Sequence, residues 1–222
     1  MKRILLFGAT GRTGTLLVNY ALEKGYAVTA LVRNPEKLTV RSEHVTIIKG
    51  LPTNPADVKK AMEDCDIVIS TLSALSVKES FSLKKIQPPH TLETSIRNAI
   101  ESMTARGKKR IITLSSIGAG DSFPLAPWFM RVIINITNFK IVFADHTRQE
   151  ALLRHSTLDW TIARPVALND NRDLEQLVVS YNQRPSPFKM SRKQLAKFMV
   201  DCIDNSDFLY KAPILSEKPA HV

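Results

Sequence analysis

The sequence predicts an α/β protein built on a doubly wound parallel sheet, with helices covering both faces. Short apolar runs such as residues 4–7 and 67–70 lack polar alternation, which is typical of strands that are buried on both sides. Segments with apolar residues at helical spacing alternate with these runs along the chain. The 222 residues, 44% hydrophobic and 23% charged, have the composition of a globular protein.

The first half of the chain is expected to contain four strands and three helices. Gly25 ends the first helix, Pro55 lies in the first turn of the second, and Gly107 ends the third. The strands are expected at residues 4–7, 27–32, 45–48 and 67–70, and the helices at residues 13–24, 55–63 and 91–106.

The second half continues this pattern and then changes in composition. Ser191 and Gln194 have the spacing of a capping box, which would open a helix running to about residue 204. Because proline is denser after Pro165, residues 166–222 are expected to elaborate a single domain that spans residues 1–222. The remaining elements are strands at residues 110–115, 160–163 and 212–215, a loop at 118–127, and a helix ending near 154–155.

The formal net charge of +10 favours anionic ligands without naming one. The basic cluster of Arg106, Lys108, Lys109 and Arg110 lies at the expected end of a helix, where the helix dipole favours cations. No nucleic-acid-binding motif accompanies the cluster, so we expect no nucleic-acid partner. Binding of nucleic acid through net charge alone is a weaker alternative.

The cysteine content and the apolar runs indicate a compartment. Cys65 and Cys202 lie far apart, which excludes a disulfide framework and fits a reducing cytoplasm. The amino-terminal apolar run is too short for a secretory signal, and no run approaches the ~20 apolar residues of a membrane span. The five histidines lack metal-ligand spacing. We therefore expect a cytoplasmic protein with no membrane association and no metal, and the oligomeric state stays open.

The strongest motif is Gly8-Ala9-Thr10-Gly11-Arg12-Thr13-Gly14, which lies between an expected strand and an expected helix. Glycine permits a tight turn, close approach of the backbone to a pyrophosphate, and close packing of the helix on the strand. The N–H groups of the first helical turn then face the phosphate. The motif predicts dinucleotide binding, and the alternative is a turn that only connects two elements.

The end of the second strand indicates which dinucleotide binds. NAD-selective sites commonly carry Asp or Glu there for the ribose 2′-hydroxyl. This chain has Arg33 instead, with Lys37 four residues later and Arg12 in the glycine turn. Three cations converging on one pocket match a 2′-phosphate, so the sequence favours NADP(H). The alternative is that Arg33 is a solvated loop cation.

These motifs, together with Leu114-Ser115-Ser116 and residues 158–165, resemble the atypical short-chain dehydrogenase/reductase family with its NmrA-like members. The resemblance runs over nearly the whole chain. Asp145-His146-x-Arg148 is more particular to the biliverdin-IX-beta reductases and NADPH-dependent flavin reductases of that family. The resemblance implies a Rossmann fold and NADPH-dependent reduction.

The resemblance also implies positions for the cofactor. The glycine turn would hold the pyrophosphate, with Arg33 and Lys37 on the 2′-phosphate. Ser116 matches the family's active-site serine, and His146 matches a histidine that lines that site. Residues after three later strands would complete the site: Leu72, Ser73 and Ala74 beside the adenosine, Leu114, Ser115 and Ser116 at the nicotinamide, and Pro165 and Val166 near its carboxamide.

The chain departs from its relatives at three places. Leu51 stands where relatives carry an aspartate that meets the adenine, and Ala167 stands where the reductases carry a second histidine. Val142 and His146 occupy the tyrosine and lysine positions of short-chain alcohol dehydrogenases. Without that tyrosine, proton relay to an alkoxide is not expected, which disfavours alcohol dehydrogenase and sugar epimerase activity.

The remaining residues suit hydride transfer from the nicotinamide to a flavin, or to a similarly flat acceptor such as a linear tetrapyrrole. In this interpretation Ser116 polarises the acceptor or orients the carboxamide, and His146 is a candidate proton donor. Alternatively, Ser116 only forms a hydrogen bond with the backbone at the end of the strand. For His146 the alternative is a surface pair with Glu150, four residues further along the same helix.

The loop after the fifth strand is expected to carry three aromatic residues, Phe123, Trp128 and Phe129. They either cover a flat substrate or only make ordinary hydrophobic packing contacts within a lid. The competing function is an NmrA-like sensor that binds NADP(H) without turnover. The missing tyrosine fits both functions, since neither the flavin chemistry nor sensing needs it. Ser116 and His146 favour the enzyme, and Ala167 favours the sensor.

Overall fold

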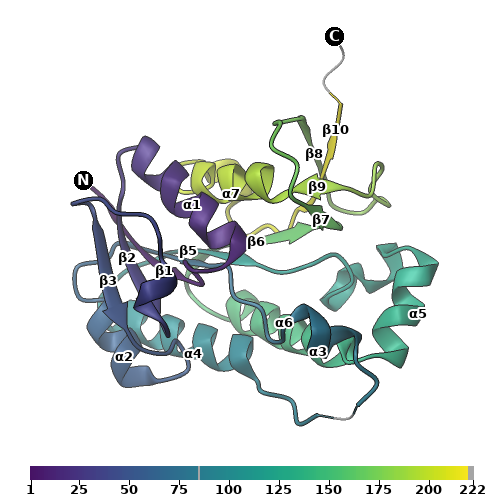
Figure 1. Cartoon of the computed structure of the whole chain (residues 1–222), viewed down its shortest axis with the longest axis horizontal. Helices are drawn as coiled ribbons and strands as arrows, with labels where there is room; N and C mark the ends of the chain where they lie inside the picture. The colour runs from purple at the N-terminus through teal and green to yellow at the C-terminus, as the bar shows by residue number, and fades with distance from the viewer. Residues whose placement is uncertain (85, 220–222) are drawn as a thin grey trace.

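A computed structural model describes residues 1–84 and 86–219, and within them the chain forms one eight-stranded sheet and one two-stranded sheet (Figure 1). The strands of the large sheet follow the order β3-β2-β1-β4-β5-β6-β10-β8. Every neighbouring pair is parallel except β10 and β8. The doubly wound α/β fold is confirmed.

The direction of strand addition reverses beside β1. From β1 (Arg3–Phe7) the chain builds β2 (Ala27–Val32) and β3 (Val45–Lys49) on one side. On the other side lie β4 (Ile67–Ser70), β5 (Arg110–Leu114) and β6 (Asp159–Pro165). The carboxyl ends of β1 and β4 therefore flank a switch point, where sheets of this kind leave a crevice for ligands.

Helices cover both faces of the sheet (Figure 1). The helices α1 (Arg12–Glu23) and α7 (Arg192–Asp201) pack together on one face. The other face carries α2 (Pro55–Ala61), α4 (Thr91–Ala105) and α6 (Phe139–Arg154). Because strand side chains alternate between the two faces, β1 feeds both cores, with Ile4 and Leu6 in the first and Leu5 and Phe7 in the second.

The predicted capping box at α7 is half correct. Ser191 Oγ accepts a hydrogen bond from the Gln194 backbone N–H at 3.1 Å, as predicted. The return bond from the Gln194 side chain is wrong, because the Ser191 N–H donates instead to Glu217 Oε1 at 2.7 Å. Ser191 Oγ also donates to Glu217 Oε2 at 3.0 Å. A fully buried glutamate from a distant strand thus completes the cap.

Two helices were not expected from the sequence. The first is α3 (Val77–Phe81), and the second is α5 (Trp128–Ile136). Trp128 and Phe129 therefore open a helix and do not lie in the loop, whereas Phe123 lies in the 3-10 helix η2 (Gly120–Leu125) inside the expected loop. Arg131 and Asn135 lie four residues apart on one side of α5 and the other side is apolar, so α5 is amphipathic and its sequence does carry a helical period.

The carboxyl-terminal segment completes the main sheet as well as elaborating it. β10 (Ile214–Lys218) lies parallel to β6, and β8 (Gln176–Ser180) forms the antiparallel edge. The short strands β7 (Leu168–Asn169) and β9 (Met190–Ser191) pair with each other. Two further 3-10 turns are η1 (Pro35–Lys37) and η3 (Ser206–Phe208). The assignment of residues 1–222 to one domain stays a prediction.

Two further expectations concern cysteines and apolar helices. Cys65 and Cys202 are both free thiols in the core, in agreement with the expected lack of a disulfide framework. Burial raises the pKa of Cys65 to about 11 and that of Cys202 to about 12, so both stay protonated at neutral pH. None of the helices in residues 1–84 and 86–219 combines the length and apolar content needed to cross a bilayer.

The Glu217 cap gives a stability prediction. Replacing Glu217 with alanine removes two hydrogen bonds to Ser191 and leaves a buried N–H without its partner, so we expect a loss of about 2 kcal/mol. Urea unfolding measures the change. The exposed Glu101→Ala variant on α4 is the control and should stay within about 0.5 kcal/mol of wild type. Equal stability of Glu217→Ala and wild type would contradict this account of the α7 cap.

Candidate functional site

The turn between β1 and α1 is built around two glycines. Gly8 has φ +86°, and a Cβ atom on it would lie 2.8 Å from Thr71 Oγ1. A Cβ atom on Gly14 would lie 2.0 Å from the Gly8 carbonyl oxygen, which no side chain tolerates. The Gly11 N–H donates to that same carbonyl at 3.0 Å. The turn therefore needs glycine at positions 8 and 14.

The first turn of α1 has free backbone donors. Gly11 is the N-cap and brings no side-chain oxygen, and no acidic residue stands in the first turn. The N–H groups at this end are therefore without a side-chain cap in the described part of the chain, and the helix dipole adds partial positive charge. Such an end binds phosphate.

A cavity of about 360 Å³ opens beside this turn at the carboxyl ends of the strands. Segments that lie far apart in the sequence meet in its wall, as expected for a ligand crevice at a switch point. Six of the predicted cofactor residues line it: Gly8, Thr10, Arg33, Lys37, Leu72 and Ser73. The other lining residues are Leu31, Val32, Asn34, Leu51, Pro52, Thr53 and Thr91.

The cavity holds two of the three predicted cations. Arg33 and Lys37 are exposed, and neither forms an ion pair within residues 1–84 and 86–219. Arg12 is directed elsewhere, because its guanidinium lies 3.2 Å from Asp170 Oδ2, and Asp170 also pairs with Arg192. The predicted convergence of all three cations is therefore wrong for the Arg12 side chain. Its backbone remains in the turn between β1 and α1, together with Gly11, Thr13 and Gly14, and this turn is called the phosphate turn below.

The adenine side of the cavity is mostly apolar. Leu51, which replaces the expected aspartate, lines it together with Pro52 and Leu72. The Leu51 N–H donates to Asp57 Oδ2 at 2.9 Å, so a carboxylate is near but is engaged by the backbone. Ser73 Oγ donates to the Leu75 carbonyl at 2.9 Å. Ala74 is not among the lining residues and packs with Val142 and Phe143 instead.

The predicted nicotinamide residues meet at the ends of β5 and β6. The Ser115 N–H donates to the Ala163 carbonyl at 2.7 Å, and the Ile117 N–H donates to the Pro165 carbonyl at 3.1 Å. The Leu114 carbonyl accepts a hydrogen bond from the side chain of Gln149 on α6, and the Val166 N–H donates to the Leu215 carbonyl at 3.0 Å. Within the described part of the chain, the half-buried Ser116 hydroxyl forms one hydrogen bond, which it donates to the Ile117 carbonyl at 3.2 Å.

Behind these strand ends lies a buried ionic network that was not expected from the sequence. Ser115 Oγ donates to Glu150 Oε1 at 2.6 Å, and Arg164 Nε donates to the same oxygen at 3.0 Å. Arg164 also bonds the second Glu150 oxygen and Asp121 of η2. Burial opposes the charged form of Arg164, but the two carboxylates outweigh it and raise the pKa. The network fixes η2 onto the sheet.

His146 is a buried, uncharged imidazole. Its side chain is 6% exposed, and burial lowers the pKa to about 4 although the nearby Asp145 opposes that shift. The surface pair between His146 and Glu150 is wrong, because Glu150 is buried and bonds Arg164. Burial disfavours the charged form of His146 in the free protein, and its role as a proton donor stays a prediction.

The aromatic residues near the site divide into two groups. Phe123 is partly buried and packs with the Phe143 cluster, which supports ordinary packing for that residue. Trp128 is 72% exposed and Phe129 is 47% exposed on α5. The Phe129 ring lies 6.5 Å from that of Phe188 in the carboxyl-terminal segment, edge to face. Aromatic surface therefore extends from α5 toward this segment.

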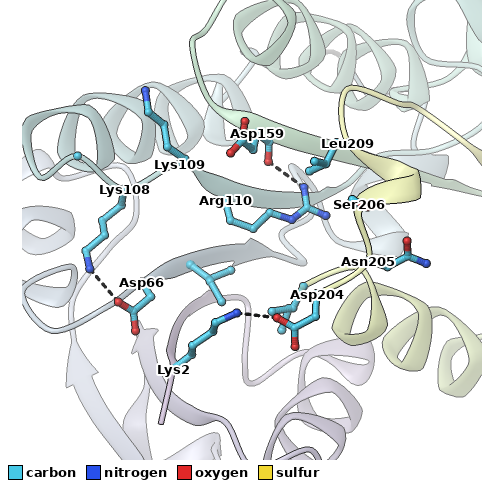
Figure 2. Close-up of a pocket in the computed structure, with 13 residues that line it drawn as sticks. Lys2, Asp66, Lys108, Lys109, Arg110, Asp159, Asp204, Asn205, Ser206 and Leu209 are labelled. Carbon is cyan, nitrogen blue, oxygen red and sulfur yellow. Dashed lines mark hydrogen bonds and ion pairs between the residues drawn. The ribbon is translucent and has the colours of Figure 1, made fainter.

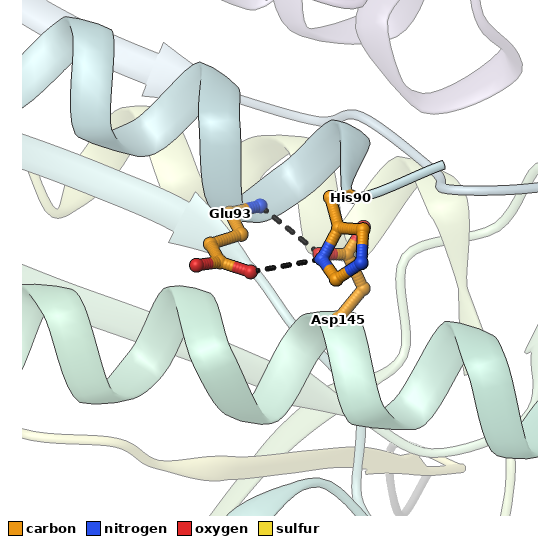
Figure 3. A group of neighbouring side chains, drawn as sticks. All are labelled: His90, Glu93 and Asp145. Atoms are coloured by element: carbon orange, nitrogen blue, oxygen red, sulfur yellow. Dashed lines mark hydrogen bonds and ion pairs between the residues drawn. The ribbon is translucent and has the colours of Figure 1, made fainter. Parts of the chain in front are cut away.

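His90, Glu93 and Asp145 gather at the start of α4, with one ligand-type atom of each within 4.8 Å of the others (Figure 3). Asp145 accepts from the backbone N–H groups of Leu92 and Glu93 at 2.9 and 3.1 Å, so it caps α4. Glu93 is paired with Arg148 at 2.8 Å. These bonds account for both carboxylates as structural groups, and the expectation of no metal stays a prediction.

A second cavity, of about 410 Å³, lies at the opposite edge of the sheet, where β4, β5 and β6 begin (Figure 2). Three residues of the predicted basic cluster, Lys108, Lys109 and Arg110, line it. Lys108 pairs with Asp66 at 2.8 Å, and Arg110 donates to the Asp159 carbonyl at 2.8 Å. Two of its cations are thus bound by the protein itself, which agrees with the structural interpretation of the cluster.

The fold and the phosphate turn together define a dinucleotide-binding protein of the Rossmann type. The NAD(P)H-binding family matches residues 8–206, and the chain belongs to that family. The cofactor is therefore NAD(P)H, as the glycine turn predicted.

The curated relatives match over part of their length. A probable pinoresinol-lariciresinol reductase 3 of Arabidopsis thaliana is 33% identical over 89 residues, 38% of this chain and 29% of that protein. Photosystem II assembly factor Ycf39 of Synechocystis is 27% identical over 161 residues, 72% of this chain and 43% of that protein. The chain spans less than half the length of these two relatives.

Solved structures of low identity share the fold. One is ChuY of Escherichia coli, described as an anaerobillin reductase, with TM-score 0.78 and 23% identity over 99% of this chain and 100% of that one. Another is a short-chain dehydrogenase/reductase of Veillonella parvula in complex with NADP, with TM-score 0.74 and 18% identity over 100% and 97% of the two chains. Both support the layered α/β architecture.

The low pKa of His146 predicts a pH effect on stability. Because the folded pKa of about 4 lies below the unfolded value of about 6.5, the unfolded chain binds more protons between these values, and stability falls as the pH falls through them. Between about pH 7 and pH 5, the free energy of unfolding of the wild type should fall by about 2 kcal/mol more than that of His146→Leu. Urea unfolding at the two pH values measures both. Identical pH dependence of the two proteins would contradict the burial of an uncharged His146.

Proposed function

We propose that the protein is an NADPH-dependent reductase that transfers hydride to a flavin or another flat conjugated acceptor. The observation that carries the cofactor choice is the pair of exposed cations, Arg33 and Lys37, in the wall of the cavity beside the phosphate turn. Neither has a carboxylate partner in the described residues, so a 2′-phosphate would supply the missing negative charge.

The residues at the nicotinamide end support reduction of a conjugated acceptor more than alcohol chemistry. When bound, NADPH supplies a hydride from its nicotinamide C4. Val142, at the position of the alcohol dehydrogenase tyrosine, is 6% exposed and has no proton to give. The chain's own task is then to align the two partners and exclude water, because a conjugated acceptor spreads the incoming charge over its rings.

Ser116 is the proposed active-site hydroxyl. Its Oγ is half-buried at the carboxyl end of β5, and its contact with the Ile117 carbonyl leaves the oxygen lone pairs free to accept a hydrogen bond. The hydroxyl is thus able to orient the carboxamide or to contact the acceptor. The neighbouring Ser115 differs because it is buried, and its hydroxyl proton is held by Glu150.

The acceptor class is supported by the aromatic surface of α5. Trp128 and Phe129 are exposed side chains of a kind that covers a flat ring system, and Phe188 faces Phe129 from the carboxyl-terminal segment. The description of the ChuY fold neighbour as an anaerobillin reductase fits a flat, conjugated substrate. The absence of a second histidine at Ala167 leaves the particular acceptor open.

The second candidate is an NmrA-like sensor that binds NADP(H) without turnover. Ala167 favours it, because the second histidine of the reductases is missing, whereas Val142 fits both functions. The two functions separate in one assay, which follows NADPH absorbance with FMN, riboflavin and a linear tetrapyrrole in turn. Acceptor-dependent oxidation supports the reductase. Tight NADPH binding with no oxidation by any acceptor supports the sensor and rejects the reductase.

The cation pair predicts cofactor selectivity. Arg33→Ala should weaken NADPH binding by about tenfold to a hundredfold, the value of one charge-assisted contact, and should leave NADH binding nearly unchanged. Calorimetry with both cofactors measures the two affinities. Arg184→Ala removes an equally exposed arginine elsewhere and should change neither. Equal losses for NADPH and NADH in Arg33→Ala would reject the 2′-phosphate assignment.

The Ser116 hydroxyl predicts a separation of turnover from binding. Ser116→Ala should lower kcat about tenfold or more, while the Kd for NADPH changes less than about twofold, because the hydroxyl acts on the reacting end of the cofactor. Steady-state kinetics with the best acceptor gives the first value, and calorimetry gives the second. Ser206→Ala, an exposed serine at the opposite edge of the sheet, is the control. An unchanged kcat would return Ser116 to a structural role.

A further inference from the structure

Gln149 joins β5 to His146 in the interior. Its side chain is fully buried on α6, one turn beyond His146. Gln149 Nε2 lies 2.8 Å from the Leu114 carbonyl oxygen and 3.0 Å from His146 Nδ1. Leu114 is the last residue of β5 and stands two positions before Ser116. One amide group therefore touches both the strand end and the histidine of the proposed active site.

The orientation of this amide is fixed by chemistry. A backbone carbonyl only accepts hydrogen bonds, so the atom that faces Leu114 has to be the NH₂ group, since two oxygens at 2.8 Å would repel each other. Gln149 Oε1 is left buried and without a partner in the described residues. The amide thus keeps the Leu114 bond although its own oxygen remains unsatisfied.

The same NH₂ group determines the protonation of His146. Its second hydrogen is available to the ring nitrogen 3.0 Å away, so Nδ1 is the acceptor and carries no proton. A neutral imidazole has one N–H, which then lies on Nε2. Within residues 1–84 and 86–219 Nε2 has no hydrogen-bond partner, and the residue as a whole is 6% exposed.

We infer that Gln149 is a positioning residue that holds His146 as a neutral imidazole with its proton on Nε2, ready to donate a hydrogen bond to the substrate. The matching substrate presents a lone pair, such as a carbonyl oxygen or a ring nitrogen, next to the atom that receives hydride. His146 then stabilises the developing negative charge without giving up its proton. The part of this inference that concerns the substrate rests on the proposed reductase function. The part that concerns the tautomer of His146 does not.

The surrounding charges are committed to other partners. On α6 itself, Asp145 caps α4 and Glu150 bonds Arg164. Neither carboxylate forms a hydrogen bond with the His146 ring in the described residues, so Gln149 is the group that decides which ring nitrogen carries the proton. The elements packed against α6 add the titratable or charged residues Lys78, Glu79, His90, Glu93, Arg97, Glu101, Asp121, Arg131, Asp159 and Arg164.

The direct test is histidine NMR on the full chain. Labelled with ¹⁵N and ¹³C histidine, the protein gives ring signals, and that of His146 is the one missing from the His146→Leu variant. We expect the neutral Nε2–H pattern from about pH 5.5 to pH 8, with no titration near the ordinary value of about 6.5. An Nδ1–H pattern, or an imidazolium that titrates near 6.5, would overturn the inference whatever the enzyme reduces.

Two substitutions test the role of the amide. In Gln149→Glu a carboxylate accepts from Nδ1–H, so the proton should move to Nδ1 and the pKa of His146 should rise. Gln149→Met keeps the length of the side chain and removes both donors, so the ring should lose its single tautomer. With riboflavin as the probe, both variants should lower kcat/KM about tenfold while the Kd for NADPH stays within about twofold.

The exposed Gln183→Glu variant adds the same charge away from the site and should behave as wild type. Wild-type kcat/KM and an unchanged Nε2–H signal in both Gln149 variants would overturn the inference. If riboflavin is not reduced by wild type, the acceptor proposal fails, and the NMR signal of His146 still decides the tautomer. If Gln149→Glu does not fold, the inference is tested by the kinetics and the His146 signal of Gln149→Met, together with the wild-type spectrum.

Discussion

The approach of α1 to the Gly8 carbonyl is the constraint on which the rest of the structure depends. With a Cβ atom on Gly14 placed 2.0 Å from that oxygen, only glycine lets the helix start so close to the end of β1. The position of the helix then fixes where its free N–H groups point, beside the cavity lined by Gly8 and Thr10. Because β1 and β4 are neighbours at the switch point, the ends of β2 and β4 reach the same cavity. Cofactor binding therefore follows from a steric requirement within the backbone.

The two ends of the proposed site use charge in opposite ways. At the phosphate end, Arg33 and Lys37 are exposed and available to an anionic ligand. At the reacting end, the charges of Glu150 and Arg164 are buried and cancel each other, and His146 is uncharged. A ligand with a phosphorylated end and a weakly polar ring system fits this distribution. The reacting end lacks a strong acid, which suits transfer of hydride to a conjugated acceptor, since such an acceptor needs alignment more than it needs a proton.

The parts of the fold that could be predicted are those with local causes. The turn from Gly8 to Gly14 combines a strand, glycine spacing and a helix within a few residues, and the sequence shows all three. The Glu150–Arg164 pair could not be predicted, because it joins a helix to a later strand and neither residue's sequence position indicates its partner. α5 was missed although Arg131 and Asn135 share one side of it, and β8 is an edge strand that depends on pairing with the later strand β10. The place of His146 in the site stays a prediction, and its burial and its pKa depend on tertiary packing, which the sequence does not show.

The central claim is that backbone amides at the start of α1 hold the dinucleotide, and backbone NMR on titration with NADP⁺ tests it most directly. The account predicts saturable amide shifts concentrated in residues 8–14, with a second group at Arg33, Lys37, Leu72 and Ser73 around the same cavity. Shifts confined to the Lys108–Arg110 cavity at the opposite edge of the sheet, or no saturable shifts at all, would contradict it.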